Sequence, residues 1–431
     1  MSRKVLPATH QAVRRDSANR MSTLAASAGG QVMVLVCVSL IALMGMIAVV
    51  TDFSFMQHQK NMMQTAADSA AMAGAEELNY GDQVAAGQTD AASNGYTNGV
   101  SSVTVTINNP PSTGPNTSNS AYVEAIVSKP EPTYFLRVLG VSTMTVSTRA
   151  VAYEGNGPNC IYVLNPSASG AFSANGNVSV TSSCGLLVDS SSSSGLSVVG
   201  NVSITAPTIG VVGGFSAGGN SSLTPTPKTG VIAASDPLAY LQAPTVGSCA
   251  HTNYSLNGNS GSASTPLQLY AGTYCGGITV HGNAWLKFNA GTYVLAGGGM
   301  AISANTTMTG TGVTFYNTTG TGGYGAISMN GNTQANLSAP TSGPLAGILF
   351  FQDRSIPSSG AGSTITGNSS STFDGAVYFP TTALSFNGNS SASGYSIVVA
   401  NQLTLSGNAS LGSNYSSLAN GSPIKGTILA E

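Results

Sequence analysis

The stretch NGNVSVTSS at residues 175–183 returns nearly unchanged as VGNVSITAP at residues 199–207, and this repeat decides the fold of most of the chain. The same Gly-Asn pair occurs in HGNAWLKFN (281–289) and SGNASLGSN (406–414), each time just before a short strand pattern. Several of the copies are 19 to 24 residues apart. The Asn of the pair stands at positions 177, 201, 220, 259, 283, 332, 368, 389 and 408. A period of about 20–25 residues, with strands and no helical pattern, predicts a parallel β-helix, or β-solenoid, over residues 155–431.

The Gly-Asn pair has a structural explanation in such a coil. Each strand stacks on its equivalent about 4.8 Å away, and the chain must turn a corner between strands. Glycine supplies positive φ, while asparagine tolerates the left-handed region and can form a ladder with the asparagine above it. SANTTMTGTGVTF (303–315) fits as a degenerate copy around Asn305. We therefore expect the pair at corners, with no ligand.

The composition excludes several classes of function. Charged residues make up 6% of the chain and the net charge is −2, whereas soluble domains carry roughly 25% charged residues. This balance predicts no polyanionic partner and hence no nucleic acid, and it leaves too few charges for a typical enzyme surface. The charges beyond residue 154 are Asp189, Lys228, Asp236, Lys287, Asp353, Arg354, Asp374, Lys425 and Glu431.

An apolar run near the N-terminus predicts a membrane anchor. Val32–Val50 is interrupted only by Ser39 and Gly45 and would span roughly 28 Å as a helix, close to a bilayer core. A secretory signal core is usually only about 7–15 residues long, and no small-residue cleavage pattern follows this run. A retained span is favoured over a cleaved signal peptide or a buried core helix.

The flanking charges predict the orientation of this span. Residues 1–20 carry Arg3, Lys4, Arg14, Arg15 and Arg20 against one acid, whereas Lys60 is the nearby base on the far side. Lys and Arg near a span stay in the cytoplasm, so the N-terminus is expected inside and residues 52–431 outside.

The helix is expected to continue beyond the membrane through residues 52–79, which contain no proline. Its alanine-rich part, residues 56–74, has one face of small residues at three- and four-residue steps, which lets another backbone approach closely. That face could pack on the next domain of the same chain or on a partner protein. It is formed by Met56, Gln59, Met63, Ala66, Ala70 and Ala73.

A small α+β module follows. Residues 80–101 are polar and read as a connection, 103–111 and 121–130 as strands ended by proline, 131–140 as a short helix stopped by Gly140, and 141–155 as a long strand.

The segment at 29–75, with Gly30-Gln31, the apolar span, Asp52 and NMMQTAADSAAMAGA, resembles the N-terminal TadG-like segment of the Tad/Flp pilus-assembly proteins. The module that follows is similar to the exoplasmic part of such bacterial proteins. The resemblance implies a non-catalytic component of a surface pilus and secretion apparatus in the bacterial cytoplasmic membrane, whose partners are other pilus-assembly or envelope proteins and the lipid bilayer. The chain lacks a von Willebrand A-type metal pattern, and the fifth position after Gly30, where prepilins carry Glu, is Leu35.

Pattern and resemblance together predict a mainly β protein in four parts. These are a cytoplasmic basic tail (1–29), a TadG-like transmembrane and juxtamembrane helix (30–79), a small α+β exoplasmic module (80–154) and a β-solenoid repeat domain (155–431).

The competing class is a surface-anchored carbohydrate-active β-helix enzyme or an adhesin. Glycoside hydrolysis needs two carboxylates about 5–9.5 Å apart, and Asp353 and Asp374 lie about one coil apart, with Arg354 and Lys287 as accompanying bases. The alternative is an Asp-Arg pair and a turn-forming Asp-Gly. The serine run 190–194 has no nucleophile elbow, and we predict no catalytic, cofactor or metal site.

The cysteines predict two disulfides. Cys160 and Cys184 are one coil apart, as are Cys249 and Cys275, and stacking at about 4.8 Å falls inside the roughly 4.4–6.8 Å Cα separation that a disulfide needs. Four buried thiols are the alternative. Cys37 lies in the apolar span and is expected to be free.

Both the anchor and the disulfides are checked by one intact-mass measurement. The protein is extracted from membranes and alkylated without reductant after unfolding. The mass should include Val32–Val50 and one alkyl group, on Cys37. A chain that starts after residue 50 or at Gln31, or one carrying five alkyl groups, would contradict these expectations.

Overall fold

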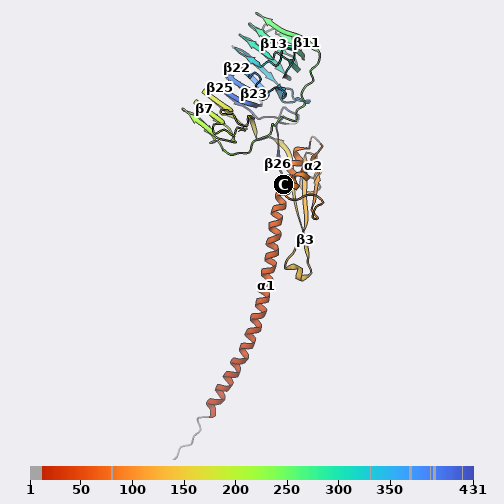
Figure 1. Cartoon of the computed structure of the whole chain (residues 1–431), viewed down its shortest axis with the longest axis vertical. Helices are drawn as coiled ribbons and strands as arrows, with labels where there is room; N and C mark the ends of the chain where they lie inside the picture. The colour runs from red at the N-terminus through yellow and green to blue at the C-terminus, as the bar shows by residue number, and fades with distance from the viewer. Residues whose placement is uncertain are drawn as a thin grey trace, which may run out of the picture. The chain divides into compact units, whose positions relative to one another are not determined.

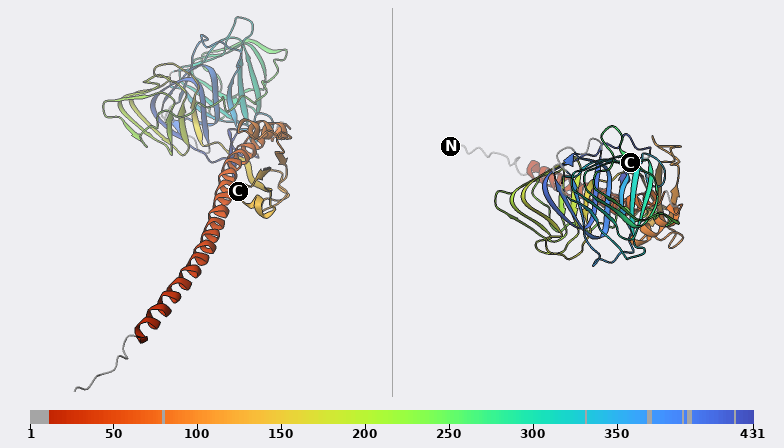
Figure 2. Two further views of the ribbon diagram at one scale, coloured as in Figure 1. Left: turned by 60° about the horizontal axis from the view of Figure 1, so that its bottom comes forward. Right: turned by 90° about the horizontal axis from the view of Figure 1, so that it is seen from above.

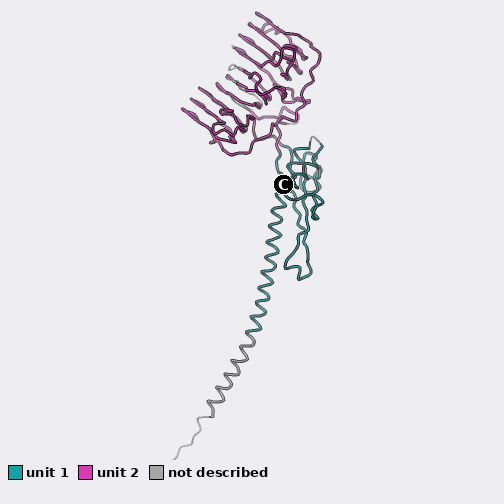
Figure 3. Tube along the Cα trace, viewed as in Figure 1, with its two compact units in different colours: residues 1–154, 427–431 teal, residues 155–426 magenta. Residues whose placement is uncertain are grey.

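The computed structural model describes residues 12–431 except 79–80, 331, 368–370, 389, 392–394 and 420, and for residues 12–31 it describes the backbone alone. The chain is mainly β with a long N-terminal apolar helix. It forms two compact units, residues 1–154 with 427–431 (unit 1) and residues 155–426 (unit 2), coloured separately in Figure 3. Arg3 and Lys4 of the predicted basic tail lie outside the described residues, as do Asn368 and Asn389 of the Gly-Asn pairs.

Helix α1 (Ala12–Glu76) carries the apolar run and continues beyond it without a break to Glu76 (Figure 1). Within the described residues it is the one helix long and apolar enough to cross a bilayer. The side chains of the run face outward, and Ile41 is 71% exposed. The interpretation as a buried core helix is therefore wrong, because no part of the described chain covers this surface.

The small face at the C-terminal half of α1 is buried within the chain. Of the predicted face, Met63, Ala66 and Ala70 have no exposed area, whereas Met56, Gln59 and Ala73 are half-buried. The adjacent Ala67, Ala71 and Ala75 are also fully buried, and all six buried side chains form one cluster with the sheet of unit 1. The alternative in which the alanine-rich helix 56–74 binds a partner protein through this face is thus incorrect for these residues, because the chain's own strands occupy it.

Residues 80–101 do not form a simple connection. Helix α2 (Gln83–Ser93) lies in this segment and packs against α1. Gly87 permits the approach, since a methyl group there would come within 2.9 Å of the Ala70 carbonyl oxygen. The glycine that made the segment read as a loop is a packing residue at the contact between two helices.

The sheet of unit 1 has four strands in the order β1-β2-β3-β26, and the β1–β2 and β2–β3 pairs are antiparallel. The strands match the three predicted strand positions, but the predicted helix at 131–140 is a single 3-10 turn because β2 extends through Pro132. The C-terminal strand was not predicted. The elements are β1 (Thr104–Asn108), β2 (Tyr122–Pro132), η1 (Leu136–Leu139), β3 (Thr143–Asn156) and β26 (Lys425–Leu429).

Unit 2 is built from short strands that pair in parallel with strands about one period away, which Figures 1 and 2 show as successive layers. The strands are β4 (Asn159–Val163), β5 (Phe172–Ser182), β6 (Gly185–Val188), β7 (Leu196–Thr205), β8 (Ile209–Val211), β9 (Phe215–Gly218), β10 (Ser222–Thr224), β11 (Cys249–Asn257), β12 (Leu267–Leu269), β13 (Gly272–His281), β14 (Ala284–Phe288), β15 (Gly291–Ala296), β16 (Met300–Ser303), β17 (Thr306–Thr311), β18 (Val313–Thr318), β19 (Ile327–Met329), β20 (Gln334–Ser338), β21 (Ile348–Gln352), β22 (Ser363–Gly367), β23 (Thr372–Gly388), β24 (Ser390–Ser391) and β25 (Ser396–Leu411).

The layers are not stacked in the order of the sequence. Strand β25, near the C-terminus, pairs in parallel with β4 and β5, the first strands of unit 2. The layers therefore run from β11 through β25 to β4, and then on to the strands around β10. Because β10 and β11 are consecutive in sequence but lie at the two ends of this order, the chain between them must travel the length of the stack. We call that segment, residues 225–248, the strap.

The core of unit 2 contains a column of aromatic rings. Tyr274, Tyr293, Phe315 and Phe350 come from successive layers, and neighbouring ring centroids are 5.9, 5.4 and 5.4 Å apart. All four side chains are buried. The ring spacing follows the strand spacing, so each of these four layers contributes one ring to a continuous apolar core.

The corners follow the predicted Gly-Asn pairs, with one correction. The residue with positive φ is the glycine, with φ of 85° at Gly176 and 105° at Gly200, and Asn201 is not left-handed. Gly176 and Gly200 are partners in the β5–β7 register. An asparagine ladder between layers is present elsewhere, where the Asn305 Nδ2 donates to the Asn283 Oδ1 at 3.0 Å.

Replacing Gly200 by Ala should destabilise unit 2. The methyl group would meet the Gly176 carbonyl oxygen at 2.8 Å in a left-handed backbone, which costs about 1–3 kcal/mol of unfolding free energy. Gly218→Ala is the matched control, because a methyl group there meets nothing within 4 Å, and it should change stability by less than about 0.5 kcal/mol. Urea titration followed by the far-UV β signal measures both. Equal effects of the two variants would contradict this account of the corner.

Candidate functional site

The carboxylate of Asp52 joins helix α1 to the turn between β2 and β3. Asp52 lies two residues beyond Val50 and is fully buried. Its Oδ1 accepts a hydrogen bond from the backbone N–H of Tyr134 at 2.9 Å, and its Oδ2 accepts from Phe135 at 3.0 Å and Leu136 at 2.7 Å. These N–H groups open the η1 turn and have no partner within it. One side chain therefore caps the turn and fixes it beside the helix.

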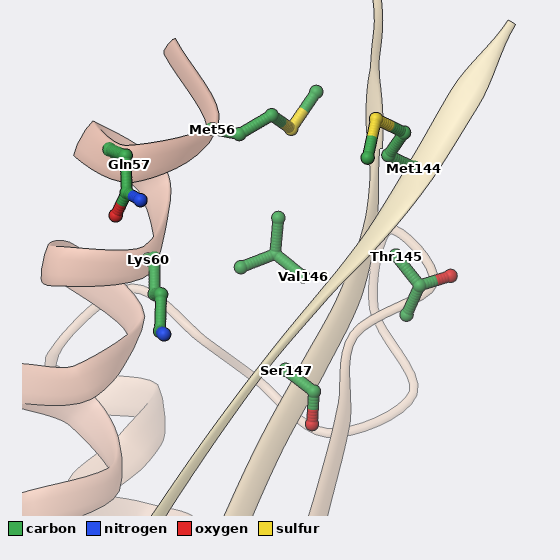
Figure 4. A pocket seen from close by; sticks show the side chains of 7 residues that line it. All are labelled: Met56, Gln57, Lys60, Met144, Thr145, Val146 and Ser147. Carbon is green, nitrogen blue, oxygen red and sulfur yellow. The ribbon is translucent and has the colours of Figure 1, made fainter. Parts of the chain in front are cut away.

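Beside Asp52, further side chains of α1 lie against the β2–β3 turn and β3. Phe55 packs edge-on against Tyr134, with ring centroids 5.2 Å apart. Next to them is an open cavity of about 230 Å³ between α1 and β3, in which Met56 and Met144 point toward each other (Figure 4). Lys60 and Val146 complete much of its lining. The cavity lacks converging polar groups, so it has the character of an imperfectly closed packing contact.

A second buried carboxylate, Glu124, lies at the other end of β2. It is fully buried and forms an ion pair with the Arg149 guanidinium. The Asn108 Nδ2 donates to the Glu124 Oε2 at 2.8 Å, and the Ser112 N–H donates to the same oxygen at 3.0 Å. Arg149 also pairs with the Glu431 Oε2 at 2.6 Å, which ties the C-terminal residue to unit 1.

Burial disfavours the charged form of Glu124, but the hydrogen bonds outweigh it. Donors from Ser112, Asn108 and Arg149 lower the pKa of the carboxyl group from 4.5 to about 2. Glu124 is therefore ionised at neutral pH, and its charge is compensated inside the fold. The arrangement can hold three segments together, and it has no open face for a substrate.

In unit 2, Asp353, one of the two candidate catalytic carboxylates, and its neighbour Arg354 are each bound to other parts of the chain. Asp353 accepts a hydrogen bond from the Thr318 hydroxyl at 2.5 Å and from the Ser355 N–H at 2.9 Å. Burial opposes these bonds, but they prevail and lower its pKa. The Arg354 guanidinium donates to the backbone carbonyls of Leu238 and Leu241 and contacts the Tyr378 hydroxyl at 3.2 Å.

Arg354 is thus an attachment point for the strap. Its guanidinium lies over the rings of Phe351 and Tyr378, with the carbon 5.4 and 5.9 Å from the ring centroids. The Tyr378 hydroxyl donates to the Asp236 Oδ2 of the strap. Farther along the strap, the Ala234 N–H donates to the buried Asp189 at 3.0 Å.

The remaining candidates of the enzyme hypothesis lie elsewhere. Asp374 lines a cavity of about 350 Å³ whose lining includes none of Asp353, Arg354 and Lys287. Lys287 is exposed on β14, in register with Gln268 and Thr309. The structure therefore does not bring the four charged residues into one groove.

The two histidines of unit 2, His251 and His281, have different neighbours. His251 stacks on Tyr274 with centroids 4.7 Å apart, and the His281 Nδ1 lies 2.9 Å from the Ser303 hydroxyl. Among the residues that the structure describes, no three His, Cys, Asp or Glu side chains gather in a way that could hold a metal ion.

Two disulfides link adjacent layers of unit 2, in the pairs that the spacing predicts. Cys160 is bonded to Cys184 and Cys249 to Cys275, each with a Cα–Cα separation of 5.5 Å. Cys37 is free and exposed on α1. The first bridge closes the β4–β6 pair and the second the β11–β13 pair, which begins the stack.

Sequence reasoning missed the roles of Asp52, Glu124, Arg149 and the strap. A signal existed for Asp52, which is an acid directly after an apolar run. Glu124 and Arg149 sit among apolar strand residues, where an isolated charge indicates a buried pair. The strap has no periodic signal, because the side chains that hold it lie at unrelated distances along the chain, Asp189 at 45 positions and Arg354 at more than a hundred.

The Glu124 pair predicts that unit 1 loses stability in acid. The folded-state pKa is depressed, so the stabilisation is present above about pH 4.5 and is lost as the pH falls toward 2. The shift corresponds to roughly 3 kcal/mol. Amide hydrogen exchange in β2 and β3, corrected for intrinsic rates, should show falling protection over this interval. Glu124→Gln should be less protected at pH 6 and lose this pH dependence, and a persisting dependence would assign it to another group.

Comparison with known proteins places two family matches on unit 1. Residues 30–77 match the Flp pilus-assembly TadE/G-like family, and residues 62–152 match the Tad-like Flp pilus-assembly family. No curated protein matches the chain, and no solved structure matches it. The two matches overlap at residues 62–77, the part of α1 whose small face packs on the sheet. The helix with its sheet is therefore similar to the modules of Tad/Flp pilus-assembly proteins.

Proposed function

We propose that this chain is a single-pass membrane protein that serves as a structural and interaction component in the assembly of a Tad (Flp) pilus or of the cell envelope, without catalysis. The observation that carries the proposal is the coincidence of the two pilus-assembly matches with one physical module, in which an apolar helix is locked to a small sheet. The exposed apolar run supports an anchor, because none of its side chains is buried within the described protein.

The proposed division of the chain follows from this role. Residues 1–29 form the cytoplasmic tail, 30–79 the TadG-like helix, 80–154 the exoplasmic module and 155–431 the distal repeat domain. The excess of basic residues before the span supports this orientation. Two disulfides in unit 2 support an oxidising compartment for the repeat domain, since disulfides persist mainly outside the cytoplasm.

We further propose that the repeat domain is a parallel β-solenoid that works as a rigid, sparsely charged body. The parallel registers between strands one period apart and the column of rings support this. Such stacks present long surfaces to partners. Because the alanine face of α1 is used within the chain, other pilus-assembly or envelope proteins would bind the exposed faces of the exoplasmic part.

The candidate residues of the competing enzyme hypothesis have separate surroundings, which supports the non-catalytic proposal. Asp353 and Arg354 hold neighbouring backbone and the strap, and Asp374 lines a separate cavity. Glycoside hydrolysis needs two carboxylates about 5–9.5 Å apart across one groove.

Deletion and complementation in the native host test the proposal. Deletion of the gene should reduce the number of surface pili seen by electron microscopy. Purification of the tagged chain from cross-linked cell envelopes should recover other pilus-assembly proteins with it. Asp353→Asn and Asp374→Asn should each restore the pili, whereas Asp52→Ala should not, because it releases the turn from α1. Immunoblots control for abundance.

Two results would overturn the proposal. A strain without the chain could assemble pili normally, which would remove the assembly role. Alternatively, Asp374→Asn could fail at normal abundance and normal thermal stability, which would favour a chemical role for that carboxylate.

A further inference from the structure

The turn between β2 and β3 exposes an unusual amount of apolar surface. Residues 133–142 form this turn, which we call the tip. Val138 is 86% exposed and Leu139 is 76% exposed, the highest values among the large apolar side chains of unit 1 beyond the span. Three further apolar side chains of the tip are exposed, namely Tyr134, Phe135 and Val141. A contiguous patch of this kind on a small module indicates a contact surface.

The fold fixes the height of this patch along α1. Asp52 holds the backbone of residues 134–136, and it lies two residues beyond the end of the apolar run. Phe55 contacts Tyr134 at the same level, and Phe53 is 63% exposed on the helix. Figure 1 shows the β2–β3 turn lying beside α1 at this part of the helix. The exposed patch is thus continuous with the surface of the span.

The residue types at this level are those of a membrane interface. Aromatic side chains gather at the boundary between hydrocarbon and water, and four are present here, on the helix and on the tip. They are Phe53, Phe55, Tyr134 and Phe135. Arg137 is the exposed charged residue of the tip, and a long basic side chain can extend toward lipid phosphates while its stem stays in apolar surroundings.

The acidic residues near the tip do not expose negative charge. Asp52 is enclosed by the N–H groups that it accepts, and the buried Glu131 is paired with the Lys129 Nζ at 2.7 Å. Lys60 is exposed on α1 and lines the cavity next to Met144. The exposed charges around the tip are therefore basic, which suits a surface of anionic phospholipid headgroups.

We propose that the tip enters the outer interface of the bilayer that α1 spans and is a second membrane contact of the module. The inference rests on the proposed function, because it requires that Val32–Val50 cross the membrane. With α1 alone, the module could rotate about the helix axis and tilt freely. Interfacial anchors limit tilt and rotation of a span. Helix and tip together would hold unit 1 in one orientation on the membrane.

Spin-label accessibility in nanodiscs tests the proposal. The full chain, with its disulfides intact, is reconstituted at one copy per disc in phosphatidylcholine with phosphatidylglycerol. Three labelled forms are compared, the native Cys37, Cys37→Ala with Val138→Cys, and Cys37→Ala with Ser120→Cys. Ser120 is the matched control, because it is exposed and precedes β2, whose far end leads to the tip. The ten steps from Tyr122 to Pro132 span roughly 33 Å.

Relaxation by oxygen, which concentrates in lipid, is measured against relaxation by a water-soluble nickel chelate. The label at residue 138 should show a ratio of oxygen to nickel accessibility several-fold above that at residue 120. The label on Cys37 reports the anchor separately. If Cys37 is in lipid and residue 138 matches residue 120, the tip proposal is overturned while the anchor stands. If Cys37 is itself in water, the anchor fails.

A second copy of the chain is the other occupant that could cover the patch. In that case the label at residue 138 would be shielded from both reagents, and only in discs loaded with two or more copies. This outcome would also overturn the lipid contact. Val138 is exposed, so the substitution leaves the core unchanged, and unaltered thermal unfolding of the labelled form checks this.

Discussion

The parallel hydrogen-bonded stacking of one backbone layer on the next is the constraint on which unit 2 depends. Strands about 4.8 Å apart bring the backbones of neighbouring layers close together at the corners, which favours a residue without a Cβ where they touch. Gly200 sits directly over Gly176 for this reason. The same spacing sets the aromatic column and brings the cysteines of adjacent layers within bonding distance. A chain with 6% charged residues can fold because backbone ladders and an apolar core supply its cohesion.

The order of the layers imposes a second requirement. Since β25 pairs with β4 and β5, the first layers in sequence lie inside the stack and the chain has to pass from one end to the other. The strap makes this passage, and Asp189, Arg354 and Tyr378 bind it at different layers. The Arg354 guanidinium donates to the strap carbonyls of Leu238 and Leu241, whose side chains are buried, and so fixes the strap at this layer. A charged residue that looked catalytic in the sequence is explained by this topology.

The sequence predicted what depends on short-range pattern. The Gly-Asn period located the corners, and the apolar run located α1, because each signal repeats within about one layer or a few helical turns. The strand β26 and the layer order could not be predicted, since both depend on pairing between residues more than two hundred positions apart. Helix α2 was missed because Gly87 reads as a loop residue until its contact with Ala70 is known. At the candidate site the cysteine pairs followed from the period, whereas Asp52, Glu124 and Arg149 did not, because each is defined by partners from distant segments.

The buried acids of the described chain reveal how this protein uses charge. Among the described residues, four carboxylates are buried, and each one accepts a hydrogen bond or forms an ion pair within the chain itself. They are Asp52, Glu124, Glu131 and Asp189. Asp52 joins the helix to the tip, Glu124 joins β2 to β3 through Arg149, and Asp189 joins a strand end to the strap. The desolvation of each charge is compensated by hydrogen bonds or an ion pair within the chain. For Asp52, Glu124 and Asp189 the compensating groups come from another segment, so these three carboxylates fix the relative positions of the segments that they join, whereas Glu131 pairs with Lys129 of its own strand.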